Sequence, residues 1–238
     1  MIKLETHCHI KGGSWCAVAD EKTTIERYKE HGYKAIVVTT HFAPKYYNWY
    51  PADTHKGKMD YFFNIYNQFS ALAKEQGVKT FYATEVLVKD IYSEYVLVGF
   101  DREFLYDNPP LCELTQQELF ELANKHNVFM YQTHPYRDGI VLGNPKYMHG
   151  AESFNGHYHH KNNNDLAKKF CFENGLVGLS GTDYHYDIQP ITAGIYIPEN
   201  IENEKQLAKF YFENNIKTIE DEEKYIKYHL AYKNGQMK

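Results

Sequence analysis

The sequence predicts an α/β fold in which strand and helix units alternate around a parallel sheet. Short β-branched or apolar runs alternate along the chain with longer segments of helical period, and this alternation is typical of such units. The chain has 238 residues, of which 43% are apolar, so it is long enough for one sizeable core and requires no second domain. We therefore expect a single domain over residues 1–238.

Seven runs have the length and composition of strands. In chain order they are Ile2–Thr6, Ala35–Thr39, Thr80–Thr84, Tyr95–Val98, Val128–Gln132, Ala151–Phe154 and Leu176–Ser180.

Helices are expected between these strands. Their predicted ranges are Thr24–His31, Lys58–Gln76, Thr115–His126 and Asn163–Asn174. A glycine directly follows three of them, which is a common end to a helix, and Thr115 with Glu118 has the spacing of a capping box. After Pro198, two polar stretches predict further helices over Glu202–Asn214 and Asp221–Tyr232. We expect residues 203–238 to form peripheral C-terminal helices.

Charge and cysteine content exclude several classes of protein. The net charge of -5 and the absence of a long Lys/Arg run disfavour nucleic acid or an anionic membrane as the main partner. No apolar run is long enough for a membrane-spanning helix, and His7 leaves no room for a cleavable signal ahead of it. The four cysteines lack C-x-x-C spacing and suit a reducing compartment as free thiols. We expect a soluble, cytoplasmic protein.

Two paired motifs at the ends of apolar runs have the spacing of metal ligands. They are His7-x-His9 near the start of the chain and Asp183-x-His185 some 175 positions later. Because side chains alternate along a strand, both members of a pair point to one face while Cys8 points to the other. Imidazole and carboxylate groups from two distant segments can then converge on one site.

Three more potential ligands follow predicted strands. They are His41, Glu85 and His134. Imidazoles with carboxylates, and no thiolate cluster, suit zinc, iron or manganese in an open catalytic site. The rim formed by strand ends is also where the catalytic residues of α/β barrels usually lie.

These residues resemble the motifs of the polymerase and histidinol phosphatase (PHP) superfamily. The match follows the family order over nearly the whole chain, through Glu5–His9, Ser14, Ile36–His41, Thr84–Glu85, Thr133–Arg137, Glu152–Asn155 and Ser180–His185. The resemblance implies a distorted seven-stranded β/α barrel, similar to a TIM barrel, with a centre of two or three divalent metal ions that hydrolyses phosphoesters.

The resemblance also implies a ligand set. His7, His9, Glu85 and Asp183 would hold one metal, and Glu85 would bridge to a second that also binds His134. His41 and His185 would hold a third. The position of Asp20 often completes this third site in the family, although Asp20 also suits a helix cap ahead of Thr24.

The chain departs from the family pattern at two places. Thr40 stands where the family usually has an aspartate, which we expect to change the surroundings of the metals and not their presence. Many members also supply a histidine from the strand that corresponds to Tyr95–Val98, but the segment through Gly99 has none. Either a nearby side chain or water fills this place, or the second metal binds weakly.

The sequence leaves open whether other side chains near the motifs lie in the site or outside it. The histidines after Asn155, at positions 157, 159 and 160, could approach the site or form a polar surface loop. Cys8 is expected to pack away from the ligands. Cys16, close to Asp20, is the thiol placed to touch metal, and neither cysteine looks like a nucleophile.

The function that follows is hydrolysis of a small phosphomonoester by a metal-bound hydroxide. Glu85 and Asp183 are the expected catalytic carboxylates, and Arg137 is the candidate for a bidentate phosphate contact, or otherwise forms a surface salt bridge. The alternatives are a phosphodiesterase, a protein-tyrosine phosphatase, or a degenerate module that binds metal without turnover. An amidohydrolase is less expected because no lysine is placed to bridge two metals.

Overall fold

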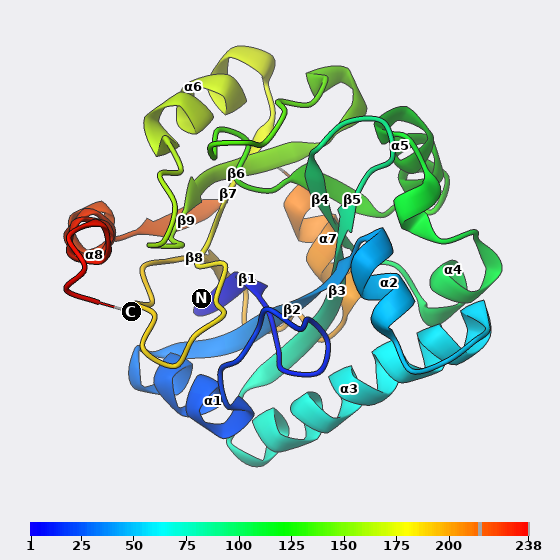
Figure 1. The fold of residues 1–238 in the computed structure, drawn as a ribbon, viewed down its shortest axis with the longest axis horizontal. Coiled ribbons are helices and arrows are strands. Elements are labelled where there is room, and N and C mark those ends of the chain that lie inside the picture. Colours follow the sequence, from blue (N-terminus) through cyan, green and yellow to red (C-terminus); the bar gives the residue numbers. More distant parts are fainter. Residues whose placement is uncertain (214–215, 238) are drawn as a thin grey trace.

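A single nearly closed, barrel-shaped sheet surrounded by helices forms the body of the protein (Figure 1). The computed structural model describes residues 1–213 and 216–237. Within these ranges the sheet has nine strands in the order β7-β6-β5-β4-β3-β2-β1-β8-β9. Their bounds are β1 Ile2–Cys8, β2 Tyr33–Phe42, β3 Lys79–Leu87, β4 Glu94–Val98, β5 Phe129–Gln132, β6 Gly150–Asn155, β7 Val177–Gly181, β8 Ala193–Ile197 and β9 Lys217–Glu220.

Each of the seven predicted strands corresponds to one of β1–β7, but the described residues contain two further strands. β8 has only five residues, includes Gly194 and ends directly before Pro198, and β9 is a short polar strand at the sheet edge, so neither gave a clear strand signal in the sequence. The prediction of a parallel sheet is wrong in part. β1–β3 and β5–β7 are parallel runs, whereas β4, β8 and β9 are antiparallel to their neighbours. Residues 88–93 are too few for a crossover helix between β3 and β4, so the chain turns back as a hairpin.

Helices cover the outside of the sheet and one end of the barrel. Their bounds are α1 Glu21–Glu30, α2 Pro44–Trp49, α3 His55–Glu75, α4 Arg102–Asp107, α5 Gln116–Lys125, α6 Asn164–Asn174, α7 Glu204–Phe212 and α8 Glu222–Lys233. The four helices predicted between strands correspond to α1, α3, α5 and α6, and the predicted capping box of α5 is present. α2 and α4 were not predicted, because each has only six residues. No helix in the described part of the chain has the length and apolarity that a bilayer span requires.

The helix predicted over Glu202–Asn214 is not peripheral as expected. α7 lies across one end of the barrel, where Leu207, Ala208 and Tyr211 are buried against the inner faces of the strands (Figure 1). Gly99, with a φ of +103°, has no Cβ, and a Cβ there would overlap Ala208, so this glycine allows α7 to approach. Asn214, the predicted last residue of this helix, lies outside the described residues.

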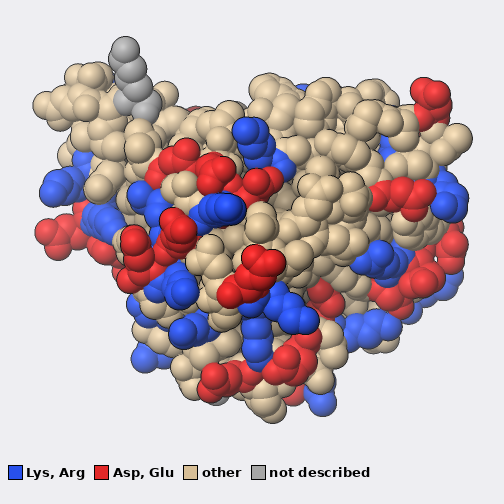
Figure 2. All heavy atoms as spheres, turned by 90° about the horizontal axis from the view of Figure 1, so that it is seen from below, with Lys and Arg blue, Asp and Glu red and all other residues tan. Residues whose placement is uncertain are grey.

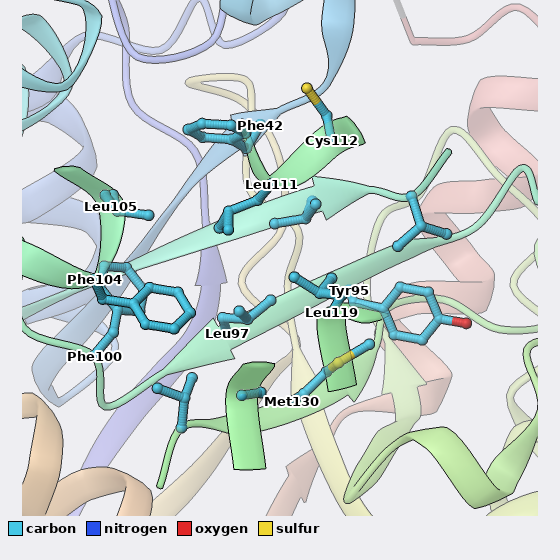
Figure 3. Packing of buried hydrophobic residues seen from close by; sticks show 14 of the residues in the cluster. Phe42, Tyr95, Leu97, Phe100, Phe104, Leu105, Leu111, Cys112, Leu119 and Met130 are labelled. Atoms are coloured by element: carbon cyan, nitrogen blue, oxygen red, sulfur yellow. The ribbon is translucent and has the colours of Figure 1, made fainter. Parts of the chain in front are cut away.

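Apolar packing divides into an outer layer and an inner cluster. Outside the sheet, Tyr95 and Leu97 of β4 pack with Phe100, Phe104 and other side chains from the helices and loops, as Figure 3 shows. The inner cluster fills the barrel at the end closed by α7, and we call this the apolar end. It contains Leu4, Val37, Phe81, Val96, Val98, Phe129, Tyr131, Leu179, Ile195, Ile197, Leu207, Ala208 and Tyr211.

The opposite end of the barrel, which we call the ligand end, buries polar side chains. An irregularity in the pairing of β1 with β2, between Glu5 and Cys8, changes which residues of β1 face inward. Leu4 therefore points into the apolar end while His7, three residues later, also points inward at the ligand end. A regular strand would have placed these two side chains on opposite faces.

Candidate metal centre

Eight histidine, glutamate and aspartate side chains meet at the ligand end. These side chains come from six strands. Each one lies within a strand or just beyond its end. The set is His7 and His9 from β1, His41 from β2, Glu85 from β3, Glu94 from β4, His134 after β5, and Asp183 and His185 after β7.

The H-x-H pair lies as strand alternation predicts. His7 and His9 point into the barrel, with their Nε2 atoms 3.0 Å apart. Cys8 points outward and packs with Ile36 and Val38 beneath the helices. Two imidazole nitrogens at this distance must share a proton or a cation, because two lone pairs facing each other repel.

Glu85 lies at the middle of the cluster and touches four imidazoles. Its Oε1 is 3.4 Å from His7 Nε2 and 3.2 Å from His134 Nε2. Its Oε2 is 2.9 Å from His41 Nδ1 and 3.4 Å from His9 Nε2. Because its oxygens face different histidines, this carboxylate is placed to bridge two cations.

Asp183 joins the two paired motifs. Its Oδ1 is 3.6 Å from His7 Nε2, 3.4 Å from His9 Nε2 and 3.3 Å from His185 Nδ1. Asp183 has a φ of +53°, and His134, which also follows a strand, has a φ of +33°. Residues other than glycine rarely take this conformation, and such strain is typical of functional sites.

Glu94 is the member of the cluster that sequence reasoning missed. The family pattern places a histidine near Gly99, but β4 is antiparallel, so its last residues lie at the apolar end and its first residue lies at the ligand end. Alternation places Glu94 on the same inward face as Val96 and Val98. Its Oε2 is 3.6 Å from His134 Nε2 and its Oε1 is 3.9 Å from His41 Nδ1. The short connection between β3 and β4 was the signal that could have found it.

Two further buried glutamates hold the ligands in place. Glu152 Oε1 lies 2.7 Å from His7 Nδ1, and its Oε2 accepts a hydrogen bond from the backbone N–H of His134. Glu5 accepts from the backbone N–H groups of His7 and Thr182, and burial raises its pKa to about 7 despite these bonds. A carboxylate behind a ligating histidine fixes the ring orientation and raises its basicity.

The chemistry of the cluster fits bound cations. Ligand atoms held about 2.1 Å from one tetrahedral ion lie about 3.4 Å apart, which matches the separations around Glu85. His41 Nδ1 and Glu85 Oε2 are buried and 2.9 Å apart, yet neither makes a hydrogen bond. In the described residues, three groups offer ligand atoms that all lie within 4.8 Å of one another: His7, His9 and Glu85; His41, Glu85 and Glu94; and His9, His41 and His185.

The pKa shifts also indicate that the centre attracts positive charge. Burial lowers the pKa of His7, but the carboxylates of Glu152, Asp183 and Glu85 outweigh it and raise this pKa well above its usual value. Conversely, burial raises the pKa of Asp183, but His7 and Arg137 hold it well below the usual range. Asp183 therefore stays ionised and His7 retains a proton, which a metal ion would displace.

Arg137 forms an ion pair with Asp183 of the cluster. Its Nη2 donates to Asp183 Oδ2 at 2.6 Å and to Asn155 Oδ1 at 2.9 Å, and its Nε donates to Asn162 Oδ1 at 2.9 Å. It therefore forms a largely buried ion pair and not the surface salt bridge that was considered, since its side chain is only 12% exposed. Its guanidinium also lines the pocket above the ligands.

Asp20 is the one predicted ligand that the structure does not bring into the cluster. It is exposed, and its carboxylate caps α1 by accepting from the backbone N–H of Thr23. Cys16 lines the ligand pocket instead and interacts with the imidazoles of His41 and His185. Burial raises the pKa of Cys16, but these two imidazoles outweigh it and lower the pKa to about 5.

An open pocket of about 160 Å³ leads to the ligands. His157, His160 and Tyr186 form part of its wall together with Arg137. Of the three histidines after Asn155, two therefore reach the pocket, whereas His159 stacks on Tyr232 with ring centres 4.1 Å apart. The pocket is small and polar, which suits a charged group more than an apolar ligand.

Comparison with known proteins gives structural matches alone. No protein-family model and no curated protein sequence matches the chain. PsfC from Pseudomonas syringae superposes with a TM-score of 0.67 at 13% identity, over 99% of each chain. A two-domain protein from Bacteroides vulgatus that contains a predicted PHP-like metal-dependent phosphoesterase has a TM-score of 0.64 at 14% identity, over 97% of this chain and 69% of that one.

A third structure, the lesion-specific endonuclease PfuEndoQ from Pyrococcus furiosus, has a TM-score of 0.58 at 14% identity. The match covers 91% of this chain and 57% of the endonuclease. These likenesses concern the fold. The resemblance to the PHP superfamily that the motifs indicated is confirmed at that level.

Proposed function

We propose that this chain, which has the PHP-type fold, is a hydrolase that cleaves a small phosphomonoester at a centre of two or three divalent transition metal ions. The position of Glu85 carries the proposal. Its two buried oxygens lie between 2.9 and 3.4 Å from nitrogens of four histidines, and one of these oxygens has no hydrogen-bond partner. A purely structural carboxylate would be expected to satisfy its oxygens with hydrogen bonds.

Each metal has a candidate set of ligands. His7, His9, Glu85 and Asp183 would hold the first ion, and Glu85, Glu94 and His134 the second. His41 and His185 would contribute to the third. Imidazole and carboxylate donors suit zinc, iron or manganese. When bound, such ions polarise a phosphoryl oxygen and activate water near neutral pH.

Arg137 and Glu152 each hold one of the metal ligands in place, and Arg137 also lines the substrate pocket. Arg137 holds Asp183 Oδ2, which leaves Oδ1 facing the histidines, while Glu152 fixes the ring of His7. The guanidinium of Arg137 also presents positive charge to the pocket, next to His157 and His160. An incoming phosphoryl group would meet hydrogen-bond donors on this side.

The size of the pocket supports a phosphomonoester. A volume of about 160 Å³ admits a terminal phosphoryl group more readily than the middle of a phosphodiester chain. Basic and acidic side chains are also intermixed on the face drawn in Figure 2. A long anionic polymer would be expected to need a continuous basic surface.

A panel of phosphate esters tests the proposal. Protein loaded with zinc, manganese or iron would be offered an aryl phosphomonoester, an aryl phosphodiester and a phosphotyrosine peptide, with metal-chelated protein as control. We expect the small monoester to be hydrolysed fastest and chelation to abolish turnover. Faster cleavage of the diester or of the peptide would favour those activities, and bound metal without any turnover would indicate a degenerate module.

A further inference from the structure

We infer that Cys16 is a thiolate ligand of the third metal site, in the place where the resemblance had suggested Asp20. The inference rests on the proposed metal centre and adds to it a soft donor atom, which narrows the metals that this site accepts. The loop between β1 and α1 carries both residues, so the question is which of the two side chains reaches the site.

The structure directs Asp20 away from the site. Its Oδ1 accepts hydrogen bonds from the N–H of Thr23 at 3.0 Å and from the Thr23 hydroxyl at 3.2 Å. Its own N–H donates to Asp187 Oδ1 at 2.9 Å. Moving Asp20 toward the metals would break this helix cap and weaken the start of α1.

Cys16 has the position that Asp20 lacks. Its side chain lines the ligand pocket together with both imidazoles of the third site, His41 and His185. The Tyr46 hydroxyl donates a hydrogen bond to Cys16 Sγ at 3.1 Å, and the Tyr46 ring stacks on His41 with centres 4.4 Å apart. A hydrogen bond to a ligating atom from a neighbouring side chain is a common support of a metal ligand.

A second observation points to a ligand at this place. His41 is 8% exposed, and its Nδ1 has no hydrogen-bond partner. His9, His41 and His185 also offer nitrogens that all lie within 4.8 Å of one another. Three imidazole nitrogens at this spacing repel one another through their lone pairs when neutral and through their charges when protonated, and a metal ion bound in place of the protons removes both repulsions.

The donor set has a chemical consequence. Imidazoles with one thiolate favour zinc, cobalt or iron, whereas a carboxylate in the same place would favour harder ions such as manganese or magnesium. The third site should therefore differ in metal preference from the site formed by Glu85, Glu94 and His134.

The other cysteines supply matched controls. Cys112 and Cys171 are buried in the apolar layer outside the sheet, away from the ligands. Alanine at either position removes a thiol without touching the metal centre. Cys8 is left unchanged because it lies between two ligands.

Titration of the metal-free full-length chain with Co²⁺ tests the inference independently of activity. A thiolate bound to Co²⁺ gives a charge-transfer absorption band in the near ultraviolet. We expect the wild-type chain and the Cys112→Ala and Cys171→Ala variants to show this band. Cys16→Ser should lose it and bind one ion fewer, while far-ultraviolet circular dichroism shows an unchanged fold.

A second variant guards against an indirect effect of the serine. Cys16→Asp should also lose the band but retain the third ion, now with a preference shifted from zinc toward manganese in competition dialysis. If the wild type binds Co²⁺ without the band, or the band persists in Cys16→Ser, Cys16 is not a ligand although the metal centre stands. If no ion binds, the proposed function fails as well.

Discussion

The two ends of the barrel interior are lined by the same strands but bury opposite kinds of side chain. At the apolar end, residues such as Val98 and Ile195 pack against Leu207 and Tyr211 of α7. At the ligand end, the same strand β4 supplies Glu94, and the buried atoms around it include a nitrogen and an oxygen without hydrogen-bond partners. The first end therefore stabilises the fold, whereas the second buries charged and unpaired polar atoms that bound cations would compensate.

Simple magnitudes indicate which end sets the stability. Fully burying one leucine side chain contributes about 1.5–3 kcal/mol. An ionised group buried without its partner costs several kcal/mol. The pKa values of two single histidines, His41 and His149, illustrate how their neighbours differ. At the ligand end, Glu85 outweighs burial and raises the pKa of His41 well above its usual value, whereas near the apolar end burial lowers the pKa of His149 to about 4.

Substitution at the ligand end should produce the largest effect, on activity and not on folding. Glu85→Gln and Asp183→Asn each remove a negative charge from the centre, so we expect the turnover number for an aryl phosphate to fall at least about 1,000-fold, roughly 4 kcal/mol of barrier. The unfolding transition should not move to lower temperature. Activity within about tenfold of wild type would make these carboxylates structural only.

At the apolar end we expect substitution to lower stability and leave activity unchanged. Leu207→Ala leaves a cavity under the barrel and should lower the free energy of unfolding by about 2–5 kcal/mol. The turnover number at a temperature where the variant is folded should be unchanged. Leu230→Ala on α8 is the control, because Leu230 is exposed and its loss should change stability by less than about 0.5 kcal/mol. A large loss of activity in Leu207→Ala would mean that the two ends are coupled.

Substitution of Arg137 tests whether a residue that holds a ligand in place also affects catalysis and metal binding. Arg137→Ala leaves Asp183 Oδ2 without its main partner, so catalytic efficiency and metal affinity should each fall about 10- to 100-fold. Arg137→Lys keeps the charge but cannot reach Asp183, Asn155 and Asn162 together, so its activity should lie between alanine and wild type. Arg102→Ala, an exposed change on α4, serves as the control. Equal efficiency in all four proteins would remove Arg137 from the site.

His149 should give the smallest effect, as a pH dependence of stability. Its Nδ1 accepts a hydrogen bond from the N–H of Met130, so the folded protein keeps the ring neutral down to about pH 4. The unfolded chain takes up a proton near pH 6.5, so the contribution of His149 is complete above that pH and is lost as pH falls toward 4. The ring is partly exposed, so we discount the effect to about 1 kcal/mol.

Urea unfolding at pH 7.5 and at pH 5 measures the contribution of His149 to the free energy of unfolding. Wild type should lose about 1 kcal/mol more between these pH values than His149→Gln does. The same loss in both proteins would show that His149 does not contribute to acid sensitivity.

Strand positions and most ligands could be predicted from the sequence because they depend on local patterns. Apolar runs locate β1–β7, and alternation alone places His7 and His9 on one face. Strand direction is set by the length of each connection and by pairing with distant strands, so the sequence pattern did not reveal that β4 is reversed. Glu94 was missed for that reason.

The remaining differences also arise from tertiary packing. The stretch that forms α7 reads as a surface helix in the sequence. Leu207 and Tyr211, one helical turn apart, lie on the face that packs into the barrel, and this packing with distant strands is what makes α7 close the barrel end. Asp20 fits a ligand or a helix cap equally well by spacing. Only the path of its loop places Cys16 in the pocket and Asp20 outside it.

The metal content of the ligand end is the most direct test of the account. Metal-free wild type and Glu85→Gln would be dialysed against zinc, manganese or iron and measured by elemental analysis. The account predicts at least two ions per wild-type chain and fewer in Glu85→Gln, since that carboxylate faces four of the histidines. Fewer than one ion per wild-type chain with every metal would contradict it.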